Sequence, residues 1–412
     1  MALGSHYDWK GCIILKSRRY TFIYLIGLFL SLAACQKEEA NTDHFVVAPH
    51  TPMPSQSPSP ALPAAVVSAS AAPVQSATPS ARPSEDDTSA ASSFSMMHFL
   101  PAENAFMSFT LLSAKQDAPP STGTVFVEYI KSDAHGTTIQ KRTFYETNKA
   151  PSVDVWYCDD NALIHTHHAE DIGYTYHYLD QHNLDEILLQ QPIQTGTTWD
   201  TPDGQSSITS IHTQIDIPLG RISTVEVTTK QKNGQTRKQY FAEGIGLVAE
   251  YHMDEQSQIV FGMEAKEREL NRRHTQRIRF FFPDQASLDI KYRTQDVNMD
   301  VNMDIPRMFT EKLSLTPSTS TLVPLSSSVS IRSIRLTSDA VHVDFSSELV
   351  TQMDLPRQTE KLLLQSLANT FGEYYQRNKV YITVEDETYE SRYFLLMDGE
   401  YLVPQTSETS PY

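Results

Sequence analysis

The sequence has no excess of basic residues. Its 33 Lys and Arg residues are outnumbered by 50 Asp and Glu residues, and the formal net charge is −17. Residues 1–34 hold four basic side chains and one acidic side chain, so the rest of the chain is more acidic still. Proteins that bind nucleic acid usually carry a basic patch or a high pI. The charge therefore excludes nucleic acid as the main partner, and it also argues against electrostatic adhesion to anionic lipid.

Motifs that would identify an enzyme are also missing. The sequence contains no Gly-x-Ser-x-Gly, no Ser-x-x-Lys and no phosphate-binding glycine loop. It also lacks the paired cysteines and the His-Glu-x-x-His pattern of common zinc sites. We therefore expect a protein that is not an enzyme and that uses no cofactor.

One apolar run, residues 20–32, follows four basic residues and ends in the sequence LAAC at residues 32–35. The run is short for a membrane span, and its basic start and small-residue end are typical of a secretory signal peptide. Residues 32–35 resemble the lipobox of bacterial lipoproteins. This resemblance implies cleavage before Cys35, lipidation of Cys35 and a lipid-anchored protein on the extracytoplasmic face of the cell membrane. The alternatives are a signal anchor, or an ordinary signal followed by a chance cysteine.

Cysteine is scarce, with only three residues in the chain. If Cys12 leaves with residues 1–34 and Cys35 carries lipid, Cys158 is the only thiol left, so no disulfide framework can form within the mature chain. Cys158 lies in a strand-like apolar run and is expected to be a buried small side chain.

The composition divides the chain into five segments. Residues 1–34 are the predicted signal peptide, and residues 35–95 form a Pro-, Ser- and Ala-rich linker that cannot bury enough apolar surface to fold. A β-rich domain is predicted over residues 97–268 and an α/β domain over residues 269–403. Residues 404–412 form a predicted tail.

Within residues 97–268, short runs of β-branched and aromatic residues alternate with turn signals. Asp203-Gly204 and Asn233-Gly234 separate such runs, as in β-hairpins. The pattern predicts an antiparallel β domain that curls into a half-barrel or packs as a sandwich. Only residues 184–190 are expected to be helical.

The residues that most suggest chemistry are His165, His167 and His168, with Asp171 close behind. In a regular strand, His165 and His167 would lie on one face, about 6.5–7 Å apart. Two histidines at that spacing and a carboxylate could bind zinc. His165 and His167 are therefore the candidate metal ligands, although a solvent-facing polar strand is the simpler interpretation and we predict no metal site.

Acidic residues also cluster, but their spacing favours structural roles. Asp159-Asp160 and Glu170-Asp171 could act in acid–base catalysis only if they faced one another across a cleft, and turn or edge positions explain them better. Residues 296–304 repeat Val-Asn-Met-Asp and are expected to be a loop or the approach to a helix. They lack the Gly and the late Glu of a calcium-binding loop.

The C-terminal part shows mixed periodicity. Strands are predicted over residues 277–284, 329–336, 341–345 and 380–384, with a short helix at 308–313 and a long amphipathic helix from Pro356 to Gly372. Together these elements predict a compact α/β (α+β) layer.

Five segments of this part resemble the sporulation and spore germination domain of the GerMN type. They are RIRFFFPD (277–284), TLVPL (321–325), IRSI (331–334), VHVDFS (341–346) and LANTF (367–371). The resemblance implies an envelope-anchored, non-enzymatic α/β domain, from a group whose related folds assemble protein rings in sporulating cells. It supplies no catalytic residue, and Asp344 is expected to cap a turn at the end of its strand.

The sequence thus predicts an envelope lipoprotein that acts by protein–protein interaction or assembly in sporulation or germination. Its expected partners are the cell membrane, through the lipid, and envelope or sporulation proteins. The alternatives are a module that binds or helps to remodel peptidoglycan, or a metal-dependent hydrolase within the His- and Asp-rich β domain.

Overall fold

A computed structural model describes residues 94–113, 121–146, 149–170, 172–315 and 321–412. The predicted signal peptide, Cys35 and nearly all of the predicted linker lie outside these residues. Within the described ranges, no helix combines the length and the apolar character needed to cross a bilayer.

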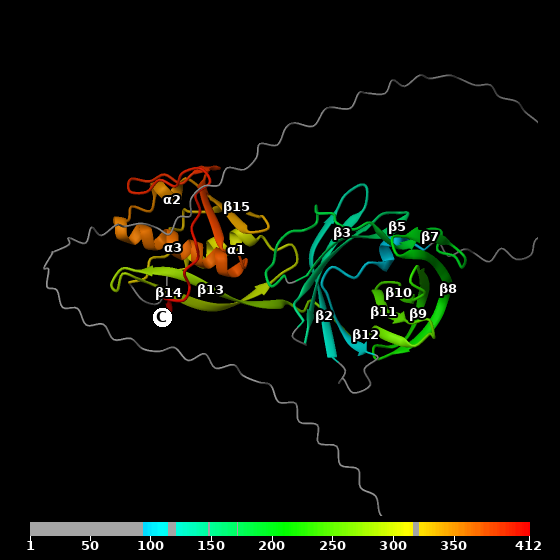
Figure 1. Cartoon of the computed structure of the whole chain (residues 1–412). Helices are drawn as coiled ribbons and strands as arrows, with labels where there is room; N and C mark the ends of the chain where they lie inside the picture. Colours follow the sequence, from blue (N-terminus) through cyan, green and yellow to red (C-terminus); the bar gives the residue numbers. More distant parts are fainter. Residues whose placement is uncertain (1–93, 114–120, 147–148, 171, 316–320) are drawn as a thin grey trace, which may run out of the picture. The chain divides into compact units, whose positions relative to one another are not determined.

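The first folded region is one twelve-stranded sheet, which is preceded by the short 3-10 helix η1 (Met96–Phe99). All of its strand pairs are antiparallel, in the order β6-β5-β4-β3-β2-β1-β12-β11-β10-β9-β8-β7. The sheet curls round on itself (Figure 1). Its strands are β1 (Ala105–Ser113), β2 (Ser121–Ser132), β3 (Thr137–Tyr145), β4 (Ser152–Cys158), β5 (Ala162–Glu170), β6 (Glu186–Gln190), β7 (Thr198–Thr201), β8 (Gly204–Ile217), β9 (Gly220–Gln231), β10 (Thr236–Ala242), β11 (Gly246–Met253) and β12 (Ile259–Leu270).

This architecture confirms the predicted antiparallel, curled β domain. Asn233-Gly234 falls between β9 and β10, and Asp203 lies in the turn between β7 and β8, with Gly204 as the first residue of β8, so both sequences mark hairpins as predicted. The helix predicted at residues 184–190 is wrong, because β6 occupies Glu186–Gln190 and pairs with β5. Burial against the sheet outweighs a weak helical preference here, since Leu188 and Leu189 are both in the core.

The inside of the curled sheet is filled at one end by an apolar cluster. Met96 and Phe99 of η1 pack there with Trp156, Cys158 and Trp199. The indole Nε1–H of Trp199 on edge strand β7 donates to the carbonyl of Ile187 on the other edge strand, β6, at 2.9 Å. This bond and the shared core hold the two edges of the sheet together.

The second folded region is a mixed α/β arrangement (Figure 1). A hairpin of two strands receives a short third strand in parallel, and a separate four-stranded sheet has the order β15-β16-β17-β18. Both sheets and the helices share one apolar core. The elements are β13 (His274–Asp284), β14 (Asp289–Met299), α1 (Ile305–Ser314), β15 (Ile331–Leu336), β16 (Ala340–Phe345), α2 (Glu348–Thr351), α3 (Arg357–Tyr374), β17 (Lys379–Val384), β18 (Glu387–Thr388) and β19 (Ser410–Pro411).

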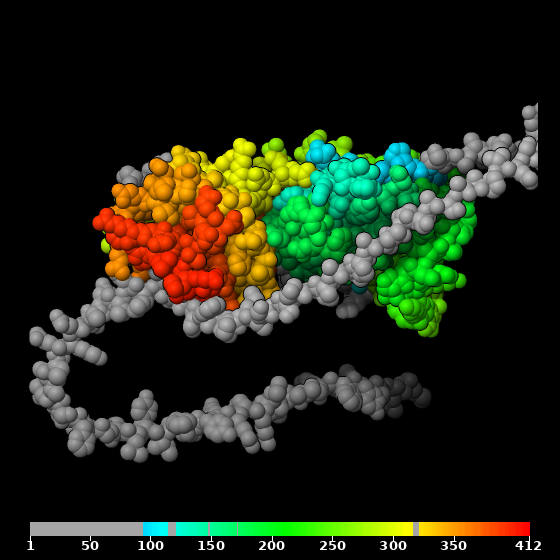
Figure 2. Space-filling model, turned by 90° about the horizontal axis from the view of Figure 1, so that it is seen from above, coloured from blue at the N-terminus to red at the C-terminus, as the bar shows by residue number. Residues whose placement is uncertain are grey.

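Three details differ from the sequence-based predictions. The Asp-rich repeat is divided: residues 296–299 end strand β14, where Val297 and Met299 are buried, whereas residues 300–304 are the predicted approach to a helix and lead into α1. Helix α3 continues past Gly372 to Tyr374. The predicted tail returns to the domain: Gln405 N–H donates to the Asn369 side chain at 2.6 Å, and the last residues (red) lie on the surface of the same region (Figure 2).

The two folded regions join through a short connection and a buried polar network. Strand β12 ends at Leu270 and β13 begins at His274, close to the predicted boundary. Across the junction, Tyr374 Oη accepts from the backbone N–H of Thr175 at 3.0 Å, and Gln276 Nε2 donates to the Thr175 hydroxyl at 2.9 Å. These bonds connect α3 and β13 to the segment that follows β5.

Candidate functional site

The inner face of the curled sheet encloses a cavity of about 610 Å³. One part of its wall, from β1, β2 and β12, is apolar and includes Met107, Phe109, Leu111, Val125 and Met263. Another part, from β3, β4, β5, β6, β10 and β11, carries ionisable side chains: Lys141, Asp154, His165, His168, Glu186, Arg237, Glu250 and His252. The cavity is therefore amphipathic, and its charges come from two groups of strands, β3–β6 and β10–β11, which the apolar strands β2, β1 and β12 separate in the sheet.

A bulge in β5 decides which histidines face this cavity. Val155 pairs with His167 and Trp156 pairs with His165, so one residue of β5 has no counterpart on β4. Consecutive residues of β4 point to opposite faces. The prediction that His165 and His167 share a face is therefore wrong, and the face of His165 is shared by His168, which pairs with Asp154.

Asp154 is the centre of the resulting cluster. Its Oδ1 lies 2.8 Å from Nδ1 of His168 and 3.0 Å from Nε2 of His165. The second nitrogen of each imidazole faces another carboxylate: Nδ1 of His165 lies 3.9 Å from Glu186, and Nε2 of His168 lies 3.7 Å from Glu170. Each ring is thus held between two acidic side chains.

These contacts shift the ionisation of the cluster. Burial alone would raise the pKa of Asp154, but the hydrogen bonds from His165 and His168 hold it well below its usual value. Burial would lower the pKa of His165, but its contacts with Asp154 and Glu186 raise it. The hydrogen bond to Asp154 likewise raises the pKa of His168. The cluster therefore favours an ionised carboxylate with positive charge on the neighbouring imidazoles.

Other charged side chains of the cavity are also paired, and the pair of Glu186 with Arg237 links strands β6 and β10, which are not neighbours in the sheet. Glu186 is ion-paired with Arg237, which helps to lower the pKa of Glu186 to about 2 against the effect of burial. Glu250 accepts from Gln239 at 2.7 Å and lies 2.7 Å from His252 Nε2. Burial lowers the pKa of Lys141 to about 7, although Asp154 and Glu250 oppose the shift.

His167, the other predicted metal candidate, lies on the opposite face of the sheet from His165. It is buried, and its ring stacks on Tyr178 at a centroid distance of 5.3 Å. Within the described residues, neither ring nitrogen has a hydrogen-bond partner, and burial lowers the pKa of the imidazole. Asp171, the carboxylate considered with it, lies outside the described residues.

The acidic pairs take structural positions. Asp159 Oδ1 accepts from the backbone N–H groups of Asn161 and Ala162, each at 2.8 Å, and so closes the β4–β5 turn. Asp160 in the same turn is exposed. Glu170 is the last residue of β5 and is exposed.

The acidic residues of the Val-Asn-Met-Asp repeat have separate partners. Asp296 pairs with Arg277 at 2.9 Å, and Asp300 pairs with Arg273 at 2.7 Å. Asp304 caps α1 by accepting from the backbone N–H of Arg307. The three carboxylates therefore do not form one calcium-binding loop.

Asp344 is buried, and it stabilises a turn as predicted. Its carboxylate accepts from Thr383 at 2.7 Å and from the backbone N–H of Asp386 at 2.8 Å, in the turn between β17 and β18. Arg332 donates to its second oxygen at 2.6 Å. Because both oxygens are engaged, the carboxylate is not free for chemistry.

Cys158 is fully buried, as predicted, and burial raises the pKa of its thiol to about 12. It is therefore a core side chain and not a nucleophile. The lipidation predicted at Cys35 concerns a residue outside the described part of the chain, and it remains a prediction.

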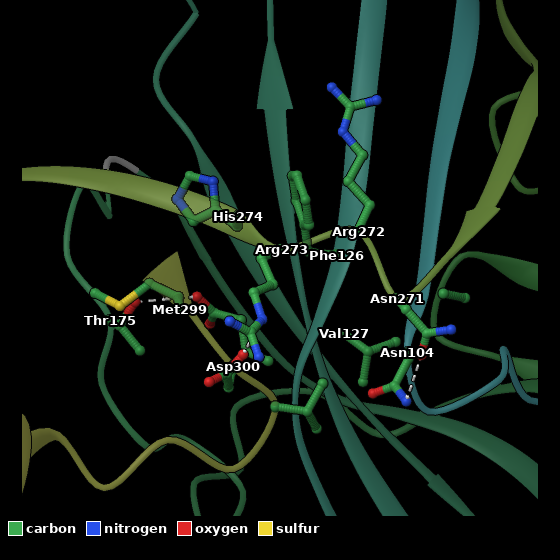
Figure 3. A pocket seen from close by; sticks show the side chains of 13 residues that line it. Asn104, Phe126, Val127, Thr175, Asn271, Arg272, Arg273, His274, Met299 and Asp300 are labelled. Carbon is green, nitrogen blue, oxygen red and sulfur yellow. Dashed lines mark hydrogen bonds and ion pairs between the residues drawn. The ribbon is translucent and has the colours of Figure 1, made fainter. Parts of the chain in front are cut away.

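A second, smaller hollow of about 230 Å³ lies where the first sheet leads into β13 (Figure 3). Arg273 and Asp300 point toward one another there at 2.7 Å, and Asn104 donates to Asn271 at 3.2 Å. His274 lines the hollow, and burial lowers its pKa to about 4. Most of these polar side chains are hydrogen-bonded or ion-paired with one another. The hollow is therefore better described as part of the connection between the two regions than as a binding site.

Sequence reasoning missed most of the charged residues of the large cavity. Asp154 and His168 could have been found from the alternation of polar and apolar residues in β4 and β5, but only if the bulge had been known. Glu186 was hidden by the helix predicted around it, while Glu250 and Arg237 lie on the β10–β11 hairpin, and the curl of the sheet brings Arg237 into contact with Glu186, 51 residues away.

Comparisons with known proteins identify the C-terminal part. Residues 279–390 match the family model described as "Germane: Sporulation and spore germination", which confirms the predicted GerMN-type domain. The match covers roughly a quarter of the 412 residues. No curated protein matches the chain.

Several solved structures are similar to parts of this chain, including three from different bacteria. An exported protein with a YmcC-like fold from Bacteroides fragilis is 10% identical, with a TM-score of 0.31, and the alignment covers 42% of this chain and 98% of that chain. The tandem GerMN domains of the sporulation protein GerM from Bacillus subtilis are 16% identical, with a TM-score of 0.25 and coverage of 34% and 48%. MucB, in its complex with MucA from Pseudomonas aeruginosa, is 9% identical, with a TM-score of 0.21 and coverage of 40% and 50%.

Proposed function

We propose that this chain is an extracytoplasmic lipoprotein, anchored through Cys35, which binds envelope proteins during sporulation or spore germination and catalyses no reaction. The observation that carries the proposal is the match of residues 279–390 to a family described by sporulation and spore germination. The lipobox-like sequence at residues 32–35 supports the anchor. The C-terminal domain is then the part that contacts other proteins, and the acyl chains keep it at the membrane.

The surface of the C-terminal domain supports a binding role. Three apolar side chains at alternating positions near its end are exposed: Tyr393 by 38%, Leu395 by 53% and Met397 by 58%. Clustered apolar side chains on a surface mark sites of protein contact more often than isolated ones. Asp344, one of the buried acids of this domain, is already committed to Arg332 and to a turn.

The partner is tested by crosslinking the full-length protein in its native cells and purifying the complexes. We expect crosslinked envelope proteins, and we expect Leu395→Ser with Met397→Ser to reduce them. The matched control is Leu288→Ser, which changes a side chain exposed by 52% in the β13–β14 turn and should leave the complexes unchanged. Recovery of peptidoglycan fragments without proteins would instead support a wall-binding module.

The anchor and the timing are tested separately. We expect palmitate labelling of the wild-type protein and loss of both label and membrane fractionation in Cys35→Ala. Unlabelled wild-type protein would contradict the lipid anchor. Production of the protein at equal levels in growing and sporulating cells would contradict the role in sporulation.

A further inference from the structure

Three potential metal ligands converge on the wall of the large cavity. One carboxylate oxygen of Asp154, one ring nitrogen of His165 and one of His168 all lie within 4.8 Å of one another. They come from the adjacent strands β4 and β5, so the backbone hydrogen bonds of the sheet fix their spacing. The β5 bulge is what brings the second imidazole to this face.

The surroundings of the two imidazoles match those of metal-bound histidines. Such histidines usually direct their second ring nitrogen to a carboxylate, a carbonyl or a water molecule, which orients the ring. Here His165 Nδ1 faces Glu186 at 3.9 Å, and His168 Nε2 faces Glu170 at 3.7 Å. Glu186 is itself held by Arg237, whereas Glu170 is exposed and lies 3.9 Å from Lys149.

We propose that Asp154, His165 and His168 bind a zinc ion, whose fourth coordination position opens into the cavity. Two imidazoles and one carboxylate suit zinc, and three protein ligands with one open position are typical of its reactive or ligand-accepting sites. This inference is independent of the proposed protein-binding role, because the residues belong to the β sheet and not to the Germane domain.

The ligand atoms, which lie within 4.8 Å of one another, must shift to admit the ion. Zinc–ligand bonds of about 2.0–2.2 Å in a tetrahedron place the ligand atoms roughly 3.3–3.5 Å apart. The oxygen of Asp154 is 3.0 Å from His165 Nε2 and 2.8 Å from His168 Nδ1, so these contacts must open by a few tenths of an ångström. Nε2 of His165 also lies 3.0 Å from the carbonyl of His167, and this contact is given up when zinc binds.

The carboxylates nearest the two imidazoles favour a cation, since Glu186 and Glu170 face His165 and His168. Over the whole cavity, Asp154, Glu186 and Glu250 are balanced by Lys141, Lys149 and Arg237, apart from the histidines. Zinc would displace the protons that the two imidazoles share with Asp154. The open position would then accept an anionic oxygen or nitrogen donor from the cavity.

Isothermal titration of the full-length, detergent-solubilised protein with zinc chloride tests the site. We expect one zinc ion per chain, and a loss of affinity of at least about 100-fold in Asp154→Ala and in His168→Ala, because each removes one of three ligands. Glu186→Gln should weaken binding by about 10- to 100-fold. The matched control is His252→Gln, which removes a cavity histidine paired with Glu250 but no proposed ligand.

Cobalt substitution tests the same site without any variant. Titration of the wild-type protein with cobalt chloride should produce the visible absorption of a four- or five-coordinate site, and azide should shift that absorption by occupying the open position. No zinc binding, or binding lost equally in His252→Gln, would overturn the proposal. A cobalt spectrum that is insensitive to azide would overturn the open position.

Discussion

The buried ion pair between Glu128 and Arg142 yields the sharpest stability prediction. Arg142 is completely buried, and Glu128 has only 7% of its side chain exposed. The guanidinium binds both carboxylate oxygens, at 2.5 and 3.2 Å, and also donates to the carbonyls of Ile172 and Tyr174. It therefore fastens the segment after β5 onto strands β2 and β3, next to the junction with the C-terminal domain.

Replacement of Arg142 by Met should cost about 3–5 kcal/mol of unfolding free energy, because it leaves a buried carboxylate without its cation. Two backbone carbonyls lose their donor as well. Glu128 keeps hydrogen bonds from Gln140 at 2.8 Å and Thr175 at 3.3 Å, which places the expected value toward the lower end of this range.

Urea unfolding followed by tryptophan emission measures this loss, since Trp156 and Trp199 both lie in the first sheet. With a slope of about 3 kcal/mol per M, the midpoint should fall by roughly 1–1.5 M. The matched control is Arg221→Met, which removes an exposed pair with Asp216 and should leave the midpoint unchanged.

A double variant decides between charge burial and simple loss of packing. Arg142→Met combined with Glu128→Leu should be more stable than Arg142→Met alone, because no unpaired charge remains in the interior. Two results would refute this reasoning: a cost below about 1 kcal/mol for the single variant, or a double variant less stable than the single one.

Three further predictions concern single sites. Burial lowers the pKa of His274 to about 4, so the neutral imidazole stabilises the fold fully above about pH 6.5. That contribution is lost as the pH falls from about 6.5 toward 4. In His274→Gln, the unfolding free energy should therefore depend less on pH over this range. Gly372→Ala would place its Cβ 2.1 Å from Cγ of Pro404 and should cost about 1–3 kcal/mol in urea unfolding, whereas Gly123→Ala meets only ordinary contacts and should be tolerated. Lys141→Met should raise the unfolding free energy at pH 7 by about 1–3 kcal/mol, since burial disfavours the charged amine, and a loss of stability would contradict this account.

The order of apolar and polar residues within each segment was sufficient to predict most of the strands and the long helix. Alternating side chains in β2, β3 and β4 predicted an antiparallel sheet, and the apolar stripe of α3 predicted the long helix. Strand β14 was missed because its residues show no regular apolar alternation: Asp289, Lys291, Arg293 and Gln295 precede the buried Val297 and Met299 at alternate positions. The strand exists because it pairs along its whole length with β13, which local propensity does not reveal.

The candidate site was harder to predict, for a geometric reason. A regular strand repeats every two residues, so the sequence pointed to His165 and His167. One extra residue in β5 reverses the face of every later side chain, and it exchanges His167 for His168. No local signal in His-Thr-His-His marks such a bulge, and Asp154 becomes relevant only once its pairing with His168 is known.

The distribution of side chains along the inner face argues that the cavity has a use. On β4, Trp156 and Cys158 belong to the apolar core, whereas Asp154, one step earlier on the same face, is charged. Apolar residues at Asp154, Lys141 and Glu250 would extend that core, and replacing buried charges by packed apolar groups is often neutral or stabilising. Folding of the sheet therefore does not require these charges. A charged cluster that the fold does not require and that faces an amphipathic cavity is better explained by a ligand that it binds.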